Sequence, residues 1–197
     1  MSCDKKTKLP GLLNCGDYAL RNAIKISKRD FADTLYYWLS EHLTDQEVKD
    51  MAHEFRFKIK GFLRIKIKKK LYEKFYSELF ALNMYLIVFT CESIIKDENK
   101  RGDILDIFHN VVFERHIKVT GISYHDWMKF MKLIYNEYNK AMEQESLLTP
   151  ILLVANEFEK NLFGKITLDP YVRFEAGMRI GGIAKQLSKT LQEYDIE

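Results

Sequence analysis

Two pairs of residues in this chain have the types and spacing of metal ligands. Asp50 precedes His53, and Asp106 precedes His109, by three positions, so each pair shares one face of a helix. Bundles that hold two metal ions use carboxylate and imidazole at this spacing, with Glu as the carboxylate and further carboxylates from two other helices. These four residues are therefore the candidate metal ligands. The alternative is that each His lies at a helix surface beside its Asp.

The most unusual segment is residues 56–70, which we call the basic stretch. Together with Phe55 it reads FRFKIKGFLRIKIKKK and has no acidic residue. Cations in such number, interleaved with apolar residues, favour salt-dependent binding of a polyanion through release of its counterions. The alternative is a solvated face without a partner. The candidate partner-binding residues are Arg56, Lys58, Lys60, Arg64, Lys66, Lys68, Lys69 and Lys70.

Charge along the chain is uneven, which bears on the choice of partner. The formal net charge is +3, yet residues 1–75 hold 17 Lys or Arg against 10 Asp or Glu, and residues 76–197 hold 14 against 18. Such asymmetry indicates association rather than fold. Three partners fit the basic stretch: a nucleic acid or other polyanion, an acidic protein surface including that of a second copy, and an anionic membrane surface, which attracts each nearby cation by about 1 kcal/mol.

The basic stretch has two possible conformations. Apolar and basic residues alternate over 55–60 and 63–68 around Gly61-Phe62, which is typical of a β-hairpin with a two-residue turn. A helix also fits, because an apolar stripe runs through the stretch and helices are expected on both sides. An unbroken helix over residues 45–97 would be about 80 Å long, too long for a compact domain. We therefore expect either a hairpin or a helix kinked near Gly61, with a slight preference for the hairpin.

The other chemically suggestive residues do not form a recognisable site. Cys15 and Cys91 have no base or metal-ligand spacing around them. Gly177, Gly181 and Gly182 superficially resemble a phosphate-binding loop, but no strand precedes them, so a close helix–helix contact explains them better. The sequence predicts no cofactor, and the aromatic residues are expected to fill the core rather than line a ligand pocket.

Helices must position these residues, because the sequence has only 3 Pro and 9 Gly. We expect Asp30 to cap one helix, and Thr44–Glu47 and Ser123–Asp126 have the form of capping boxes. Pro150 and Pro170 each follow a capping residue, as at a first helical position. The expected helices cover residues 17–28, 31–43, 45–55, 71–96, 103–118, 124–145, 150–163 and 170–193.

The chain suits a single mainly α domain. The segment 79–91 is apolar but too short to span a bilayer, so we expect a buried core helix. Residues 1–14 have no apolar segment typical of a signal peptide and are expected to be a flexible leader before a domain over 15–197. The three cysteines without paired spacing predict free thiols and a cytoplasmic location. The fold prediction is a bundle of about seven helices.

These observations favour a non-enzymatic binding or assembly module. Its contact surface would include the basic stretch, and its partner would be a nucleic acid, an acidic protein or a second copy in a homo-oligomer. The alternative is an enzyme or sensor that holds a metal or an apolar ligand between helices.

Overall fold

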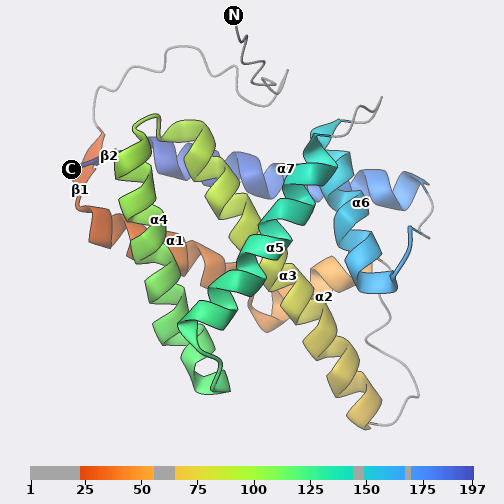
Figure 1. The fold of residues 1–197 in the computed structure, drawn as a ribbon. Helices are drawn as coiled ribbons and strands as arrows, with labels where there is room; N and C mark the ends of the chain where they lie inside the picture. Colours follow the sequence, from red (N-terminus) through yellow and green to blue (C-terminus); the bar gives the residue numbers. More distant parts are fainter. Residues whose placement is uncertain (1–22, 56–64, 144–148, 167–169) are drawn as a thin grey trace, which may run out of the picture.

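The computed structural model describes residues 23–55, 65–143, 149–166 and 170–197, and side chains within the third helix from Lys69 onward. Figure 1 shows a bundle of helices with both ends of the described chain on one side. The elements are β1 (Ile24–Ile26), α1 (Lys28–Glu41), α2 (Asp45–Glu54), α3 (Ile65–Ile94), α4 (Glu98–Val112), α5 (Tyr124–Met142), α6 (Pro150–Phe163), α7 (Pro170–Gln192) and β2 (Tyr194–Ile196). The predicted mainly α fold is confirmed.

Side-chain caps define where several helices begin. The Thr44 hydroxyl accepts a hydrogen bond from the Glu47 amide at 3.4 Å, and the Ser123 hydroxyl accepts one from the Asp126 amide at 3.2 Å. The hydroxyl half of each predicted capping box is confirmed, whereas the Glu47 carboxylate accepts from Arg179 and the Asp126 carboxylate accepts from the Ser123 hydroxyl. The prediction of Asp30 as a cap is wrong, because α1 begins at Lys28 and Ser27 accepts from the Asp30 amide at 3.1 Å. A hydroxyl three residues earlier satisfies the first turn, and Asp30 lies inside it.

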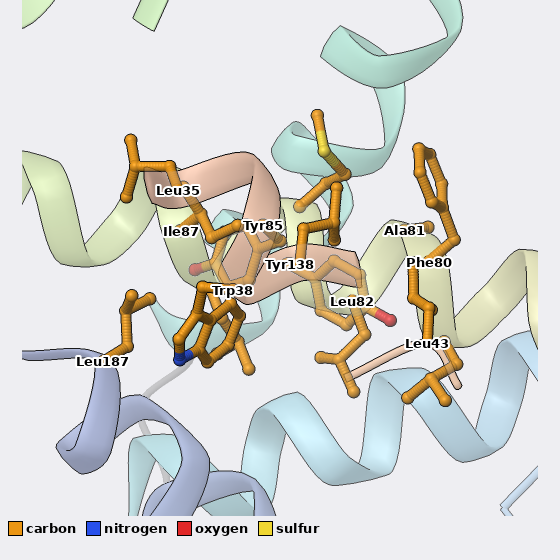
Figure 2. Packing of buried hydrophobic residues seen from close by; sticks show 14 of the residues in the cluster. Leu35, Trp38, Leu43, Phe80, Ala81, Leu82, Tyr85, Ile87, Tyr138 and Leu187 are labelled. Atoms are coloured by element: carbon orange, nitrogen blue, oxygen red, sulfur yellow. The ribbon is translucent and has the colours of Figure 1, made fainter. Parts of the chain in front are cut away.

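Helix α3 is the centre of the bundle, and it contacts all six other helices. Large apolar side chains of α3, such as Tyr85, pack against those of α1, α5 and α7, among them Trp38, Tyr138 and Leu187 (Figure 2). A helix surrounded by neighbours has no solvated face and is apolar on all sides. The expected core helix over 79–91 is confirmed, since only Phe89 in that segment is less than fully buried.

Helix α3 also has the length and composition of a membrane-spanning segment. Over Lys69–Ile94 it is the one such helix among the described residues. In its most apolar window, 67% of the residues are buried inside the bundle. Other helices of the same chain therefore already cover most of its apolar surface, as expected of a core helix.

A short parallel pairing of β1 with β2 joins the two ends of the described chain. Ile24 aligns with Tyr194 and Ile26 with Ile196. This corrects the expected helix over 17–28, whose residues 24–26 are extended, while residues 17–22 lie outside the described chain. The correction follows from tertiary context, because the β2 backbone supplies hydrogen-bond partners to β1 and the Tyr194 ring packs edge-on against Phe31.

The described part of the basic stretch is helical. Helix α2 ends at Glu54 with Phe55 as its C-cap, and α3 begins at Ile65. The hairpin alternative is therefore wrong for residues 65–68, where it required a strand. Those residues continue without interruption into a well-packed helix, and this continuity outweighs their alternating pattern. Residues 56–64, including Gly61, lie outside the described chain, as does the expected leader 1–14.

Candidate binding surface

The basic stretch ends in the first turns of α3. These turns extend beyond the neighbouring helices at the lower end of the bundle in Figure 1. Lys69 and Lys70 are both exposed, and the Lys69 ammonium lies 3.7 Å from a Glu73 carboxylate oxygen in an exposed pair. An ion pair of this kind contributes little and opens readily. Both lysines are therefore accessible to a partner.

Local electrostatics make this end of α3 attractive to anions. A helix N-terminus carries the positive end of the backbone dipole and unpaired amide groups. The first turns of α3, α6 and α7 have no acidic residue, whereas those of α1, α2, α4 and α5 have one or more. In α3 the first turn is followed directly by Lys69 and Lys70. Positive charge there adds to the dipole instead of offsetting it. An anionic group bound at this end would interact favourably with the lysines and with the helix dipole.

The remaining predicted cations lie partly outside the described chain. Lys66 and Lys68 belong to the helical backbone of α3. Arg56, Lys58, Lys60 and Arg64 fall in residues 56–64 and stay predictions.

The Asp50/His53 pair lies on α2. The Asp50 carboxylate accepts a hydrogen bond from the Gln46 amide at 2.8 Å, and His53 is exposed. His53 borders a surface cavity of about 620 Å³ together with Glu54, Glu175 and Arg179. The structure thus places His53 beside α7 rather than beside the second Asp/His pair.

The Asp106/His109 pair is divided between solvent and core. Asp106 is exposed, whereas His109 is 5% exposed. His109 Nδ1 lies 2.6 Å from the Leu105 carbonyl, which can only accept, so Nδ1 carries the proton. Nε2 then accepts from the Tyr135 hydroxyl at 2.9 Å. Both ring nitrogens are engaged within the protein, and burial lowers the pKa of the imidazole.

The described residues do not bring the two predicted pairs into one metal site. No group of three or more His, Cys, Asp or Glu with metal-binding geometry occurs among them. A protein metal centre usually has at least three protein ligands, so an Asp/His pair alone does not form one. His109 instead acts as a buried hydrogen-bonding residue.

An ion cluster between α2 and α7 had no sequence signal. Arg179 on α7 donates to Glu54 at 2.6 Å and to Glu47 at 2.7 Å. Burial acts to lower the pKa of Arg179, but the two carboxylates outweigh it and the pKa is raised. Arg179 is 125 and 132 positions away from the two carboxylates in the sequence, so no local pattern indicates that they meet. The cluster fixes α7 against α2 at the edge of the cavity beside His53.

A second polar cluster lies where α4 ends in a π-helical turn, Phe113–Ile117. The His116 ring stacks on Phe80 with centroids 5.1 Å apart, and its Nε2 lies 2.9 Å from the Tyr76 hydroxyl. Arg115 lies 2.8 Å from Asp33 and over the Tyr36 ring. The wider turn lets two consecutive residues, Arg115 and His116, face α1 and α3. These contacts hold three helices together.

Comparison of the chain with family models, with curated proteins and with solved structures gives no match.

Proposed function

We propose that this protein is a cytoplasmic, non-enzymatic binding module that uses residues 56–70 to contact an anionic partner. The observation that carries the proposal is the basic end of α3, where exposed Lys69 and Lys70 directly follow the first helical turn, which carries the positive end of the helix dipole. The six other cations of the stretch precede them directly in the chain. A partner would thus meet a dense local positive charge on a molecule whose remainder is net acidic.

The physical basis is electrostatic and independent of partner sequence. Each phosphate or sulfate that a Lys or Arg neutralises releases bound counterions, and affinity then falls steeply with salt. Exposed charges interact over about 8 Å at physiological ionic strength, so closely spaced cations act together. A non-enzymatic role is supported by burial of the candidate nucleophiles. Burial raises the pKa of Cys91 to about 12, and it raises the pKa of Tyr76 and of Tyr135, whose hydroxyl groups bond to His116 and His109. Burial thus disfavours the thiolate and phenolate forms that would act as nucleophiles.

Heparin affinity chromatography tests the proposal. Changing Lys58, Lys60, Arg64, Lys66 and Lys68 to Gln removes five positive charges and leaves a polar side chain at each position. We expect the wild-type protein to be retained at low salt and the variant to pass through the column. The melting temperature is measured in parallel, and an unchanged value shows that lost retention does not come from unfolding.

A matched variant separates local charge from net charge. Lys25, Lys96, Lys129, Lys132 and Lys140 are all exposed and lie on β1, just after the C-terminal end of α3 and on α5, outside the basic stretch. Changing these five to Gln gives the same net charge as the first variant. It should elute close to wild type. Equal loss of retention in both variants would show that only net charge matters and would contradict the proposal. Unchanged retention of both variants would also contradict it.

A further inference from the structure

The turn between α4 and α5 presents two aliphatic side chains to solvent. We call residues 118–123, all of which are exposed, the α4–α5 turn. Val119 is 83% exposed, the largest fraction among the large apolar residues that the structure describes, and Ile122 is 49% exposed. Ile117 and Tyr124 on either side pack against the core, whereas Val119 and Ile122 do not belong to it. The described bundle thus leaves two neighbouring aliphatic side chains unused.

Polar groups at the centre of the α4–α5 turn are hydrogen-bonded to the adjoining backbone. The Thr120 hydroxyl donates to the Ile117 carbonyl at 2.7 Å, and the Gly121 amide donates to the Lys118 carbonyl at 3.1 Å. Gly121 has a φ of 79°, a conformation that favours glycine, and it closes the turn. Polar groups are costly in an apolar environment unless they are hydrogen-bonded. The turn can therefore enter such an environment at a lower cost than an open loop.

Packing on both flanks holds the α4–α5 turn in place. The Phe113 and Tyr124 rings meet edge-on with centroids 5.2 Å apart, and the His116 ring stacks on Phe80. A contact group that is positioned in advance loses less conformational entropy when it binds. The two aliphatic side chains are therefore suited to insertion into an apolar partner.

The α4–α5 turn lies at the same end of the bundle as the basic end of α3. In Figure 1 both project from the lower end of the bundle, on different sides of it. Lys69 and Lys70 are exposed at one, and Lys118 is exposed beside the aliphatic side chains at the other. Exposed ion pairs join Lys69 to Glu73 and Lys118 to Glu114, and such pairs open readily. A flat surface placed against this end would meet cations and aliphatic side chains together.

The combination of cations with aliphatic side chains selects among the possible anionic partners. A membrane with anionic lipids attracts basic residues to its surface and takes up apolar side chains at the boundary between headgroups and acyl chains. A nucleic acid or an acidic protein surface also attracts the cations. Contact with phosphates or carboxylates alone would leave Val119 and Ile122 without an apolar environment. A membrane surface uses both features, so it fits this end of the bundle best.

We propose that the anionic partner of this protein is the surface of a lipid bilayer, whose headgroups bind the basic end of α3 and whose interface takes up Val119 and Ile122. This inference rests on the proposed function, because two aliphatic side chains alone give only weak membrane binding. Lipid phosphates compete with Glu73 for Lys69 and with Glu114 for Lys118. The bundle stays folded on the membrane surface, with α3 in its core.

Co-sedimentation with lipid vesicles tests the partner. The full chain is mixed with vesicles of phosphatidylcholine alone or of phosphatidylcholine with phosphatidylserine. We expect binding to the vesicles with phosphatidylserine that weakens as salt rises, and binding at least about tenfold weaker to phosphatidylcholine alone. A protein that is retained on heparin but does not bind the phosphatidylserine vesicles overturns the membrane as partner and leaves the proposed function standing. A protein that binds neither refutes both.

A matched pair of variants tests insertion of the α4–α5 turn. Val119→Ser combined with Ile122→Ser should lower the partition coefficient onto phosphatidylserine vesicles about tenfold, equivalent to about 1.4 kcal/mol, and should leave heparin retention unchanged. The control combines Phe174→Ser with Met178→Ser, at positions 51% and 59% exposed on α7, which runs across the upper part of the bundle in Figure 1. The control should bind vesicles like wild type. Equal losses in the two variants, or no loss in the first, would refute insertion of the turn.

A fluorophore that is sensitive to polarity locates the contact directly. In a background with Cys3→Ser and Cys15→Ser, Val119→Cys is labelled with nitrobenzoxadiazole, while Cys91 is buried and stays unlabelled. Phosphatidylserine vesicles should shift the emission to shorter wavelength, whereas heparin and duplex DNA should not. The same label at Met178→Cys should respond to none of the three. No shift at position 119 with vesicles, or an equal shift with DNA, would overturn the proposal.

Discussion

Stability should fall in mild acid because of His109. The imidazole is neutral in the fold, with Nδ1 donating to Leu105 and Nε2 accepting from Tyr135. Burial is the main cause that lowers its pKa, with Lys132 acting in the same direction and the Leu105 carbonyl and Asp106 acting against them. A second proton would convert Nε2 into a donor facing the Tyr135 hydroxyl, and it would place a charge in the core.

The sign of the pH effect follows from proton binding. The unfolded chain has a His pKa near 6.5, and the folded His109 has a lower one, so below about pH 6.5 the unfolded state binds more protons. The stabilisation is thus complete above pH 6.5 and is lost as the pH falls towards the folded pKa. While this difference is fully developed, each pH unit costs about 1.4 kcal/mol of unfolding free energy.

Urea unfolding at a series of pH values between 7.5 and 5 measures this effect. His116 also has a lowered pKa because of burial, so the wild-type slope contains both groups. His109→Gln removes one titrating group while its amide still accepts from Tyr135 and donates to Leu105. The variant should lose less stability than wild type between pH 6.5 and 5. A variant with the same pH dependence as wild type would refute the reasoning.

Two further predictions concern the contacts of α7. Arg179→Met removes the donor to Glu47 and Glu54, and in urea denaturation it should lower the unfolding free energy by about 1–2 kcal/mol after solvent screening. The control Lys185→Met, at an exposed position, should change the unfolding free energy by less than about 0.5 kcal/mol. Gly182→Ala should raise the unfolding free energy by about 0.5–1 kcal/mol through helix propensity. Gly177→Ala should give an unfolding free energy at least about 1 kcal/mol below that of Gly182→Ala, because its methyl group would meet Leu152. Equal results for the two glycines would show that α6 does not restrict Gly177.

Local signals in the sequence identified most of the helices. The hydroxyl caps at Thr44 and Ser123 and the prolines at 150 and 170 act within one helical turn, so their effect is visible in the sequence. The apolar segment 79–91 identified the central helix for the same reason. The helix boundaries expected at Asp30 and Asp103 are wrong because nearby side chains cap the helices earlier. Helix α1 follows Ser27, and α4 begins at Glu98 after Asp97, whose side chain accepts from the Lys100 amide. The wrong assignment at residues 24–26 results from pairing with β2.

Long-range contacts were beyond sequence reasoning. Arg179 meets Glu47 and Glu54 across more than 120 positions of sequence, and either carboxylate has other basic residues nearer in the chain. The alternating pattern at 65–68 favoured a strand, yet continuity with the packed helix α3 decided its conformation. His109 is buried whereas Asp106 is exposed, and this difference depends on a distant part of the chain, because Tyr135 of α5 packs against the His109 ring.

The central claim is that the basic stretch contacts an anionic partner through several of its cations. Its most direct test is the salt dependence of binding to a labelled duplex DNA of random sequence, measured by fluorescence anisotropy. Each phosphate contact contributes about −0.9 to the slope of log affinity against log salt, so the variant with Lys58, Lys60, Arg64, Lys66 and Lys68 changed to Gln should have a slope shallower by about 4–5. The matched variant, with Lys25, Lys96, Lys129, Lys132 and Lys140 changed to Gln, should keep the wild-type slope. A protein that does not bind the DNA at low salt, or identical slopes for all three proteins, would contradict the claim.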